Sequence, residues 1–133
     1  MINNQQRSFI ATQLPFIDIK TPVGNMQINF IDILYIKADN KHSIIYFLNK
    51  ESIKSICLLK CFEAKLQKPY FYRCHDSFIV NCLYVHCTCA NEIILHGNIR
   101  VPLSRYKTQG LKENMICLHR LIIVLLHTKN LAI

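Results

Sequence analysis

Apolar side chains recur at every second position along much of this chain, a spacing typical of β-strands that bury one face. In the segment "MQINF", for example, Met26, Ile28 and Phe30 alternate with polar residues. Other short runs are rich in the β-branched and aromatic residues that fit a pleated sheet. Segments of these two kinds lie at 16–20, 26–30, 32–38, 43–49 and 51–57, and strand character resumes after residue 70. The sequence therefore predicts a mainly β fold.

Two segments depart from this spacing and predict short helices. In "LLKCFEAKL", Leu58, Phe62 and Leu66 recur every four residues, which places them on one helix face. The hydroxyl of Ser104 can accept from first-turn amides, so we expect Ser104 to cap a second short helix over 105–113.

Turn residues separate several of the predicted strands. Pro22 and Gly24 mark a turn within "TPVGN". The stretch 92–103 is typical of a hairpin, and its bend is expected at Gly97 and Asn98.

The length of 133 residues fits one domain with a sizeable core. We expect an N-terminal tail at 1–14, a domain at 15–114 and an apolar extension at 115–133. Within this extension 121–126 is wholly apolar, but it is far shorter than the roughly 20 residues that cross a bilayer core. We therefore expect no stable membrane insertion, and a terminal helix or strand that covers the core or a partner chain.

The charge balance favours a polyanionic partner. Lysine and arginine number 16 against 8 aspartates and glutamates, which gives a formal net charge of +8. Such an excess on a small chain is typical of proteins that bind nucleic acid or an anionic membrane. A basic surface without a special partner is the alternative.

The seven cysteines do not predict a disulfide framework. Their number is odd, and the N-terminal segment has no apolar signal core that would direct secretion. We therefore expect a cytoplasmic protein, in which thiols stay reduced and behave as small buried hydrophobes. This expectation applies to most of Cys57, Cys61, Cys74, Cys82, Cys87, Cys89 and Cys117.

No pattern in the sequence predicts catalysis. The three glycines form no phosphate-binding loop, and no pair of carboxylates stands out for acid–base chemistry. Cys74 and His75 are adjacent, so on a strand they point to opposite faces and cannot act as nucleophile and base. We expect a protein that is not an enzyme and that needs no cofactor.

A metal site is the stronger alternative chemistry. In "HCTC", Cys87 and Cys89 lie on one strand face, and His96 lies across the predicted hairpin region. Zinc would need further ligands in tetrahedral arrangement, and Cys-x-x-Cys pairs are absent. The favoured interpretation is that Cys87 and Cys89 are buried and face a core. A Cys/His metal-binding or redox-sensing protein-interaction module is retained as the alternative function.

Three motifs resemble a known family when they are taken together with the predicted helix at 58–66. They are "DILYIKADNKHSIIYF" at 32–47, "F.R.H.SFIVN" at 71–81 and "I.VPLSRY" at 99–106. In order and spacing the chain resembles the LytTR family, the DNA-binding output domains of many bacterial transcription regulators. The resemblance covers about residues 15 to 112.

The resemblance implies an elongated, antiparallel, multi-sheet β sandwich with one or two short helices. It also implies that loops enter the major groove of double-stranded DNA, and it allows a homodimer on repeated sites. By the resemblance, the DNA-binding residues are Lys41, His42, Arg73, His75, Asp76, Ser77 and Arg105. Family members often follow a receiver or membrane module, and we expect no receiver domain in this chain.

Some of these residues have structural alternatives. Arg73 can form an ion pair with Glu63 or Asp76, and strand alternation can turn His75 inward. Asp76 departs from the family pattern, because many members carry a neutral or basic residue there. A carboxylate repels phosphate but can accept from the amino group of cytosine, so Asp76 can alter sequence preference, orient Arg73 or His75, or face solvent.

Overall fold

The computed structural model describes residues 2–130, which form three antiparallel sheets and three α-helices. The central sheet has the strand order β5-β4-β3-β7-β6. Its strands are β3 (Ile33–Asp39), β4 (His42–Phe47), β5 (Ser52–Ser55), β6 (Phe71–His75) and β7 (Phe78–Asn81). The predicted class is confirmed: the protein is a mainly β, antiparallel, multi-sheet sandwich.

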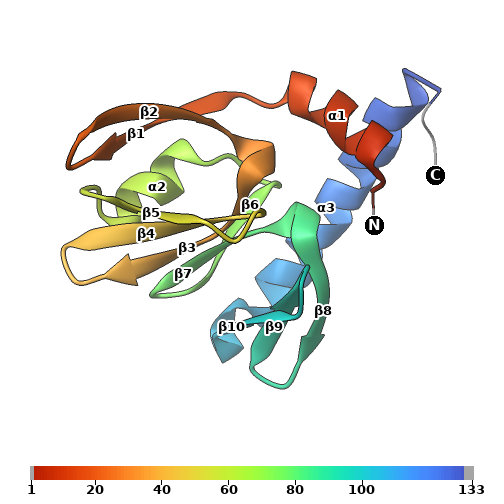
Figure 1. The fold of residues 1–133 in the computed structure, drawn as a ribbon. Coiled ribbons are helices and arrows are strands. Elements are labelled where there is room, and N and C mark those ends of the chain that lie inside the picture. Colours follow the sequence, from red (N-terminus) through yellow and green to blue (C-terminus); the bar gives the residue numbers. More distant parts are fainter. Residues whose placement is uncertain (1, 131–133) are drawn as a thin grey trace.

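The two smaller sheets flank the central one (Figure 1). The first is a hairpin of β1 (Phe16–Thr21) and β2 (Gly24–Asn29), whose turn is the one predicted at Pro22 and Gly24. The amide of Ile56 donates to the carbonyl of Lys20 at 3.0 Å and joins this hairpin to the end of β5. The second sheet contains β8 (Val85–Cys89), β9 (Glu92–Leu95) and β10 (Ile99–Pro102). Its predicted bend at Gly97 and Asn98 is confirmed, and both residues have positive φ.

The helices differ more from expectation than the strands do. The predicted helix at 58–66 is present as α2 (Leu59–Lys65), with Phe62 and Leu66 buried. Residues expected as a tail contain α1 (Asn4–Gln13). The last helix, α3 (Thr108–His127), runs through the boundary expected at 114. Ser104 does not cap it with its hydroxyl; Ser104 precedes a short 3-10 helix (Arg105–Lys107), which leads directly into α3.

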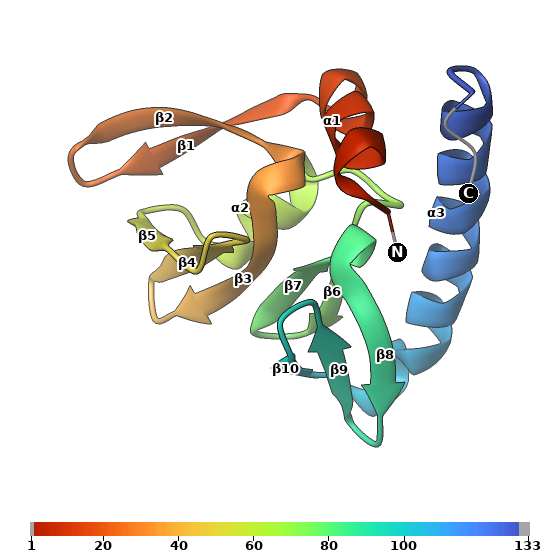
Figure 2. The same ribbon diagram turned by 45° about the vertical axis from the view of Figure 1, so that its right-hand side comes forward.

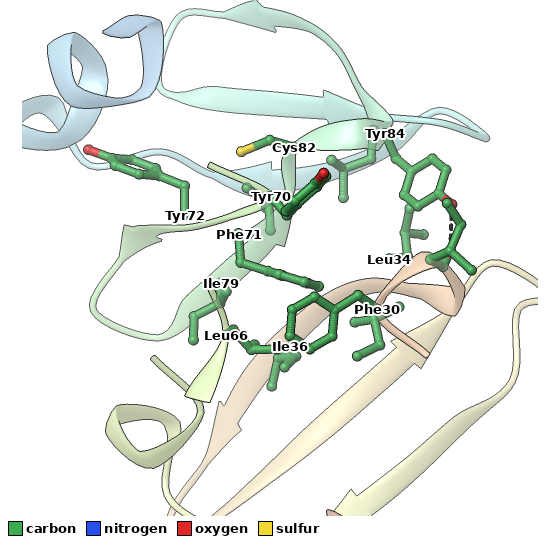
Figure 3. Packing of buried hydrophobic residues seen from close by; sticks show 14 of the residues in the cluster. Phe30, Leu34, Ile36, Leu66, Tyr70, Phe71, Tyr72, Ile79, Cys82 and Tyr84 are labelled. Carbon is green, nitrogen blue, oxygen red and sulfur yellow. Dashed lines mark hydrogen bonds between the residues drawn. The ribbon is translucent and has the colours of Figure 1, made fainter. Parts of the chain in front are cut away.

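The core connects all three layers, and aromatic residues hold its centre (Figure 3). The rings of Phe30 and Phe71 meet edge to face, with centroids 5.1 Å apart. The buried hydroxyl of Tyr84 donates to the carbonyl of Ile31 and satisfies it inside the core. Asn81 is the last residue of β7 and caps the 3-10 helix Cys82–Tyr84, which carries the chain into the second sheet.

Asn81 is fully buried, and its amide fixes the crossing between the sheets. The Nδ2 group donates to the carbonyls of Phe30 and Ile33 at 3.0 and 2.8 Å. The Oδ1 atom accepts from the amide of Leu83 at 3.1 Å. One side chain therefore satisfies three backbone groups from two distant segments.

We expect Asn81→Ala to lower the free energy of unfolding by about 2–4 kcal/mol, because buried backbone groups lose their partners. Urea unfolding followed by circular dichroism measures this change. Asn25→Ala is the matched control: Asn25 is exposed and makes no side-chain hydrogen bond within residues 2–130. Equal stability of the two variants would contradict this role of Asn81.

Candidate nucleic-acid interface

Two polar turns project from the same end of the central sheet (Figures 1 and 2). The first joins β3 to β4, where Asp39 pairs with His42 and Asn40 has a φ of 55°. The second joins β6 to β7. Because β3 and β7 are neighbours, the amide of Ala38 donates to the carbonyl of Ser77 at 2.8 Å. This bond holds the two turns side by side.

A third segment reaches this end of the sheet from the second layer. The amide of Ser104 donates to the carbonyl of Cys74 at 2.9 Å, so the chain after β10 lies along β6. Arg105 follows immediately and starts the 3-10 helix. The segments 39–42, 75–77 and 104–105 are thus linked in a row, the first to the second beside the Ala38–Ser77 bond and the second to the third beside the Cys74–Ser104 bond.

Polar and basic side chains are accessible on these three segments. Lys41, Asp76 and Arg105 are exposed, whereas His42 and Ser77 are half-buried. Tyr106 was not predicted as a site residue, yet its side chain is 91% exposed beside Arg105. The sequence signal that could have indicated Tyr106 is its place inside the "VPLSRY" motif. A large aromatic ring left open to solvent beside an arginine can pack against a nucleic acid partner.

Arg73 lies close to these turns but is engaged within the protein. Its Nη1 atom pairs with Oε1 of Glu63 at 3.0 Å, and its Nη2 atom donates to the backbone carbonyl of Asp76 at 2.7 Å. The Arg73 side chain is only 24% exposed. The structural ion pair with Glu63, one of the alternatives from sequence, is therefore present. These contacts fix the shape of the β6–β7 turn.

His75 also shapes this turn. Its Nδ1 atom accepts from the amide of Ser77 at 3.1 Å, and its ring packs edge-on against Phe78 at 5.9 Å between centroids. In the neutral ring Nε2 then carries the proton and is the remaining donor. The His75 ring is half-buried, so it neither points fully into the core nor lies fully in solvent. The carboxylate of Asp76 faces solvent beside it and has no ion pair within the described part of the chain.

Tyr72 ties the start of α3 to the central sheet. Its hydroxyl donates to the carbonyl of Lys107 at 2.9 Å. Its ring also lies so close to Gly110 that a Cβ atom at that position would collide with the Tyr72 hydroxyl. A larger residue at 110 would therefore force either the Tyr72 ring or the helix to shift. The position of Arg105 is thus fixed from both sides, by Ser104 and by the helix that follows.

The cysteines are less buried than expected. Only Cys74 and Cys82 are buried, Cys57 is half-buried, and all seven are free thiols. The exposed cysteines are Cys61, Cys87, Cys89 and Cys117. The expectation that Cys87 and Cys89 face a core is wrong, because β8 is an edge strand and most of its side chains lie in solvent. Within residues 2–130, no three His, Cys, Asp or Glu side chains are grouped so that they could hold a metal ion.

The thiol inside the "FYRCHDSFIVN" segment is protonated at neutral pH. Burial raises the pKa of the Cys74 thiol to about 12, and burial does the same for Cys82. The Cys74 sulfur lies 3.4 Å from the carbonyl of Pro102, which suits a thiol that donates weakly. Cys74 contributes to packing between the central sheet and the sheet of β8, β9 and β10. Because the thiolate is the reactive form, Cys74 has little nucleophilic character.

The chain matches a known protein family. The family model of the LytTr DNA-binding domain matches residues 24–116. The chain belongs to the LytTR family. The matched region extends from β2 into α3 and contains all three segments of the candidate interface.

A solved structure has the same fold as this LytTR domain. It is described as the LytTr DNA-binding domain of a methyl-accepting/DNA response regulator from Bacillus cereus. The two chains are 24% identical, and the match covers 76% of this chain and 96% of the other with a TM-score of 0.63. No curated protein matches the chain. Within the described residues, no helix is both long and apolar enough to cross a membrane.

Proposed function

We propose that this LytTR domain is a sequence-specific transcription regulator that inserts its turns into the major groove of bacterial DNA in the cytoplasm. The observation that carries the proposal is the convergence of 39–42, 75–77 and 104–105 at one end of the sheet. The formal charge of +8 supports a polyanionic partner. Family membership supports DNA as that partner.

The proposed contacts divide into base reading and phosphate binding. Arg105 is exposed and carries a planar fork that fits the two major-groove acceptors of guanine. His42 lies in the neighbouring turn and is proposed as a second base contact. Lys41 and Ser77 are proposed to bind phosphate, which sets the register on the duplex without reading its sequence.

In the β6–β7 turn, some residues are proposed to contact DNA and another is proposed to hold the turn in position. His75 and Asp76 can face DNA, with Nε2 of His75 as a donor and the Asp76 carboxylate as an acceptor for the amino group of cytosine. Arg73 is proposed to act mainly by positioning, since Glu63 and the carbonyl of Asp76 occupy its guanidinium. A direct DNA contact by Arg73 would require it to leave one of these partners.

Selection of bound sequences from random duplex DNA tests this function first. We expect enrichment of a defined sequence over competitor DNA and an affinity that falls steeply with salt, because phosphate contacts release counterions. Absence of salt-dependent binding by the wild-type chain would reject the regulator function altogether. Binding without any enriched sequence would reject sequence specificity alone.

Lys41→Ala should separate phosphate contacts from base contacts. We expect weaker binding to specific and scrambled duplexes alike, and a salt slope reduced by about 1. Titrations at several salt concentrations measure both quantities. Lys60→Ala is the control, because Lys60 is exposed on α2, outside the three segments. An unchanged salt slope for Lys41→Ala would remove Lys41 from the interface.

A further inference from the structure

Helix α3 has two apolar faces, and the structure accounts for only one of them. The inner face packs on the domain through buried residues, which include Leu111, Leu118, Ile122 and Leu126. The opposite face carries Ile116, Ile123 and Val124, which are 54%, 37% and 60% exposed. Figure 2 shows α3 at the margin of the molecule, with the other elements all on one side of it.

Three charged residues are exposed on this outer face: Lys112, Glu113 and Arg120. Glu113 and Arg120 are exposed and are seven residues apart, so they lie on one side of the helix about two turns from each other. Neither has an ion-pair partner within residues 2–130. Glu113 accepts one hydrogen bond, from the side chain of Gln109 at 3.3 Å. Ile116 and Cys117 lie midway between Glu113 and Arg120.

This order of residues is complementary to itself when two helices run antiparallel. If a two-fold axis passes between Ile116 and Cys117, Glu113 of one copy faces Arg120 of the other. The same axis repeats the pair on the other side, so two opposite-charge pairs flank an apolar centre. Val124 of one copy then lies over the aliphatic part of Gln109 of the other.

We propose that the outer face of α3 is a homodimer interface in which two copies of α3 pack antiparallel. A parallel pair would place Glu113 beside Glu113 and Arg120 beside Arg120, and like charges this close repel. A lipid surface would bring the Glu113 carboxylate, which accepts a hydrogen bond from Gln109 but has no ion pair within residues 2–130, against an apolar phase. One helix pair is a small interface, so the dimer forms reversibly and depends on protein concentration.

Sedimentation velocity of the full chain without DNA, over a range of concentrations, tests this interface. We expect a monomer–dimer equilibrium that Glu113→Arg and Arg120→Glu each weaken at least about tenfold, since symmetry converts both pairs into like-charge contacts. The double variant Glu113→Arg/Arg120→Glu restores opposite charges and should restore the dimer. Lys60→Glu on α2 serves as the matched charge control.

The outcomes separate the interface from the DNA-binding function, because no DNA is present. A wild-type chain that stays monomeric at high micromolar concentration overturns the proposal. So does a dimer that tolerates both single charge changes, or one that the double variant does not restore. Circular dichroism confirms that each variant is folded, as expected for substitutions at exposed positions.

Cys117 provides an independent measurement. In the proposed dimer the two Cys117 thiols lie near the axis, and a short bismaleimide should link the copies into a covalent dimer. Cys117→Ser should abolish this product, while the other exposed cysteines, Cys61, Cys87 and Cys89, remain available. A covalent dimer that persists in Cys117→Ser would place the interface elsewhere and contradict the proposal.

Discussion

A chain that ends at Asn114 is expected to lose most or all of its stability. The shortened chain lacks Leu118, Ile122 and Leu126, which α3 buries against the rest of the domain. Full burial of each such side chain contributes about 1.5–3 kcal/mol, so the loss is about 4–9 kcal/mol. Domains of this size have a total stability of about 5–15 kcal/mol. Urea unfolding of the shortened and complete chains measures the difference.

A chain that ends at Asn130 is the control for this truncation. It keeps all of α3, and we expect its unfolding midpoint to match that of the complete protein. Every proposed DNA contact precedes residue 115, so loss of DNA binding by the shorter chain follows from unfolding. A chain ending at Asn114 that unfolds at the same urea concentration as the complete chain would show that α3 adds nothing to the core.

Arg105→Ala is expected to weaken binding to the selected duplex by about 1–3 kcal/mol and to relax the preference at one base pair. Arg105 is exposed and makes no side-chain ion pair or hydrogen bond within residues 2–130, so the fold should not change. His42→Ala is expected to act in the same direction from the neighbouring turn. Titrations on specific and scrambled duplexes, at several salt concentrations, separate these effects from a general loss of charge.

Arg100→Ala controls for the removal of a positive charge. Arg100 is exposed on β10, where it pairs with Glu92 at 3.3 Å, and it lies outside the three segments. We expect its removal to leave the sequence preference unchanged. If Arg105→Ala and His42→Ala both bind the specific duplex as tightly as the wild type, the site assignment fails even though the protein binds DNA.

The strands and the short helix were predictable because the spacing of their apolar residues is visible within a short stretch of sequence. Alternation in "MQINF" reflects β2, and the four-residue spacing of Phe62 and Leu66 reflects α2. Helix α1 was not predicted, since it is short and mostly polar. A local signal for it does exist: Asn3 and Gln6 form a capping box, with hydrogen bonds of 2.8 and 2.9 Å.

The full length of α3 could not be predicted from periodicity. Apolar residues occur on its inner and outer faces, so no single stripe distinguishes it from a strand in "LIIVLL". The exposure of Cys87 and Cys89 depends on which strand lies at a sheet edge, and local sequence does not fix that order. Alternation correctly placed these two cysteines on one face but could not say which face was covered.

The candidate site was predictable in position and not in its contacts. The family motifs located the three segments, since each lies at a turn whose length and residues are recognisable. That Arg73 is held by Glu63 depends on the packing of α2 beside β6, ten residues apart in sequence. Which of the two predicted arginines is free to meet a partner is therefore a property of the folded protein, and of these two Arg105 is the exposed one.

The contact between Tyr72 and Gly110 has a mechanical consequence. Helix α3 has 20 residues and so is about 30 Å long, and it is fixed near its first turn by this contact and by the bond from Tyr72 to Lys107. Leu118, Ile122 and Leu126 hold the rest of this stiff rod against the domain. A sideways load at His127 is therefore borne along the whole rod, and Arg105 beyond its other end is shielded from that load as long as this packing holds.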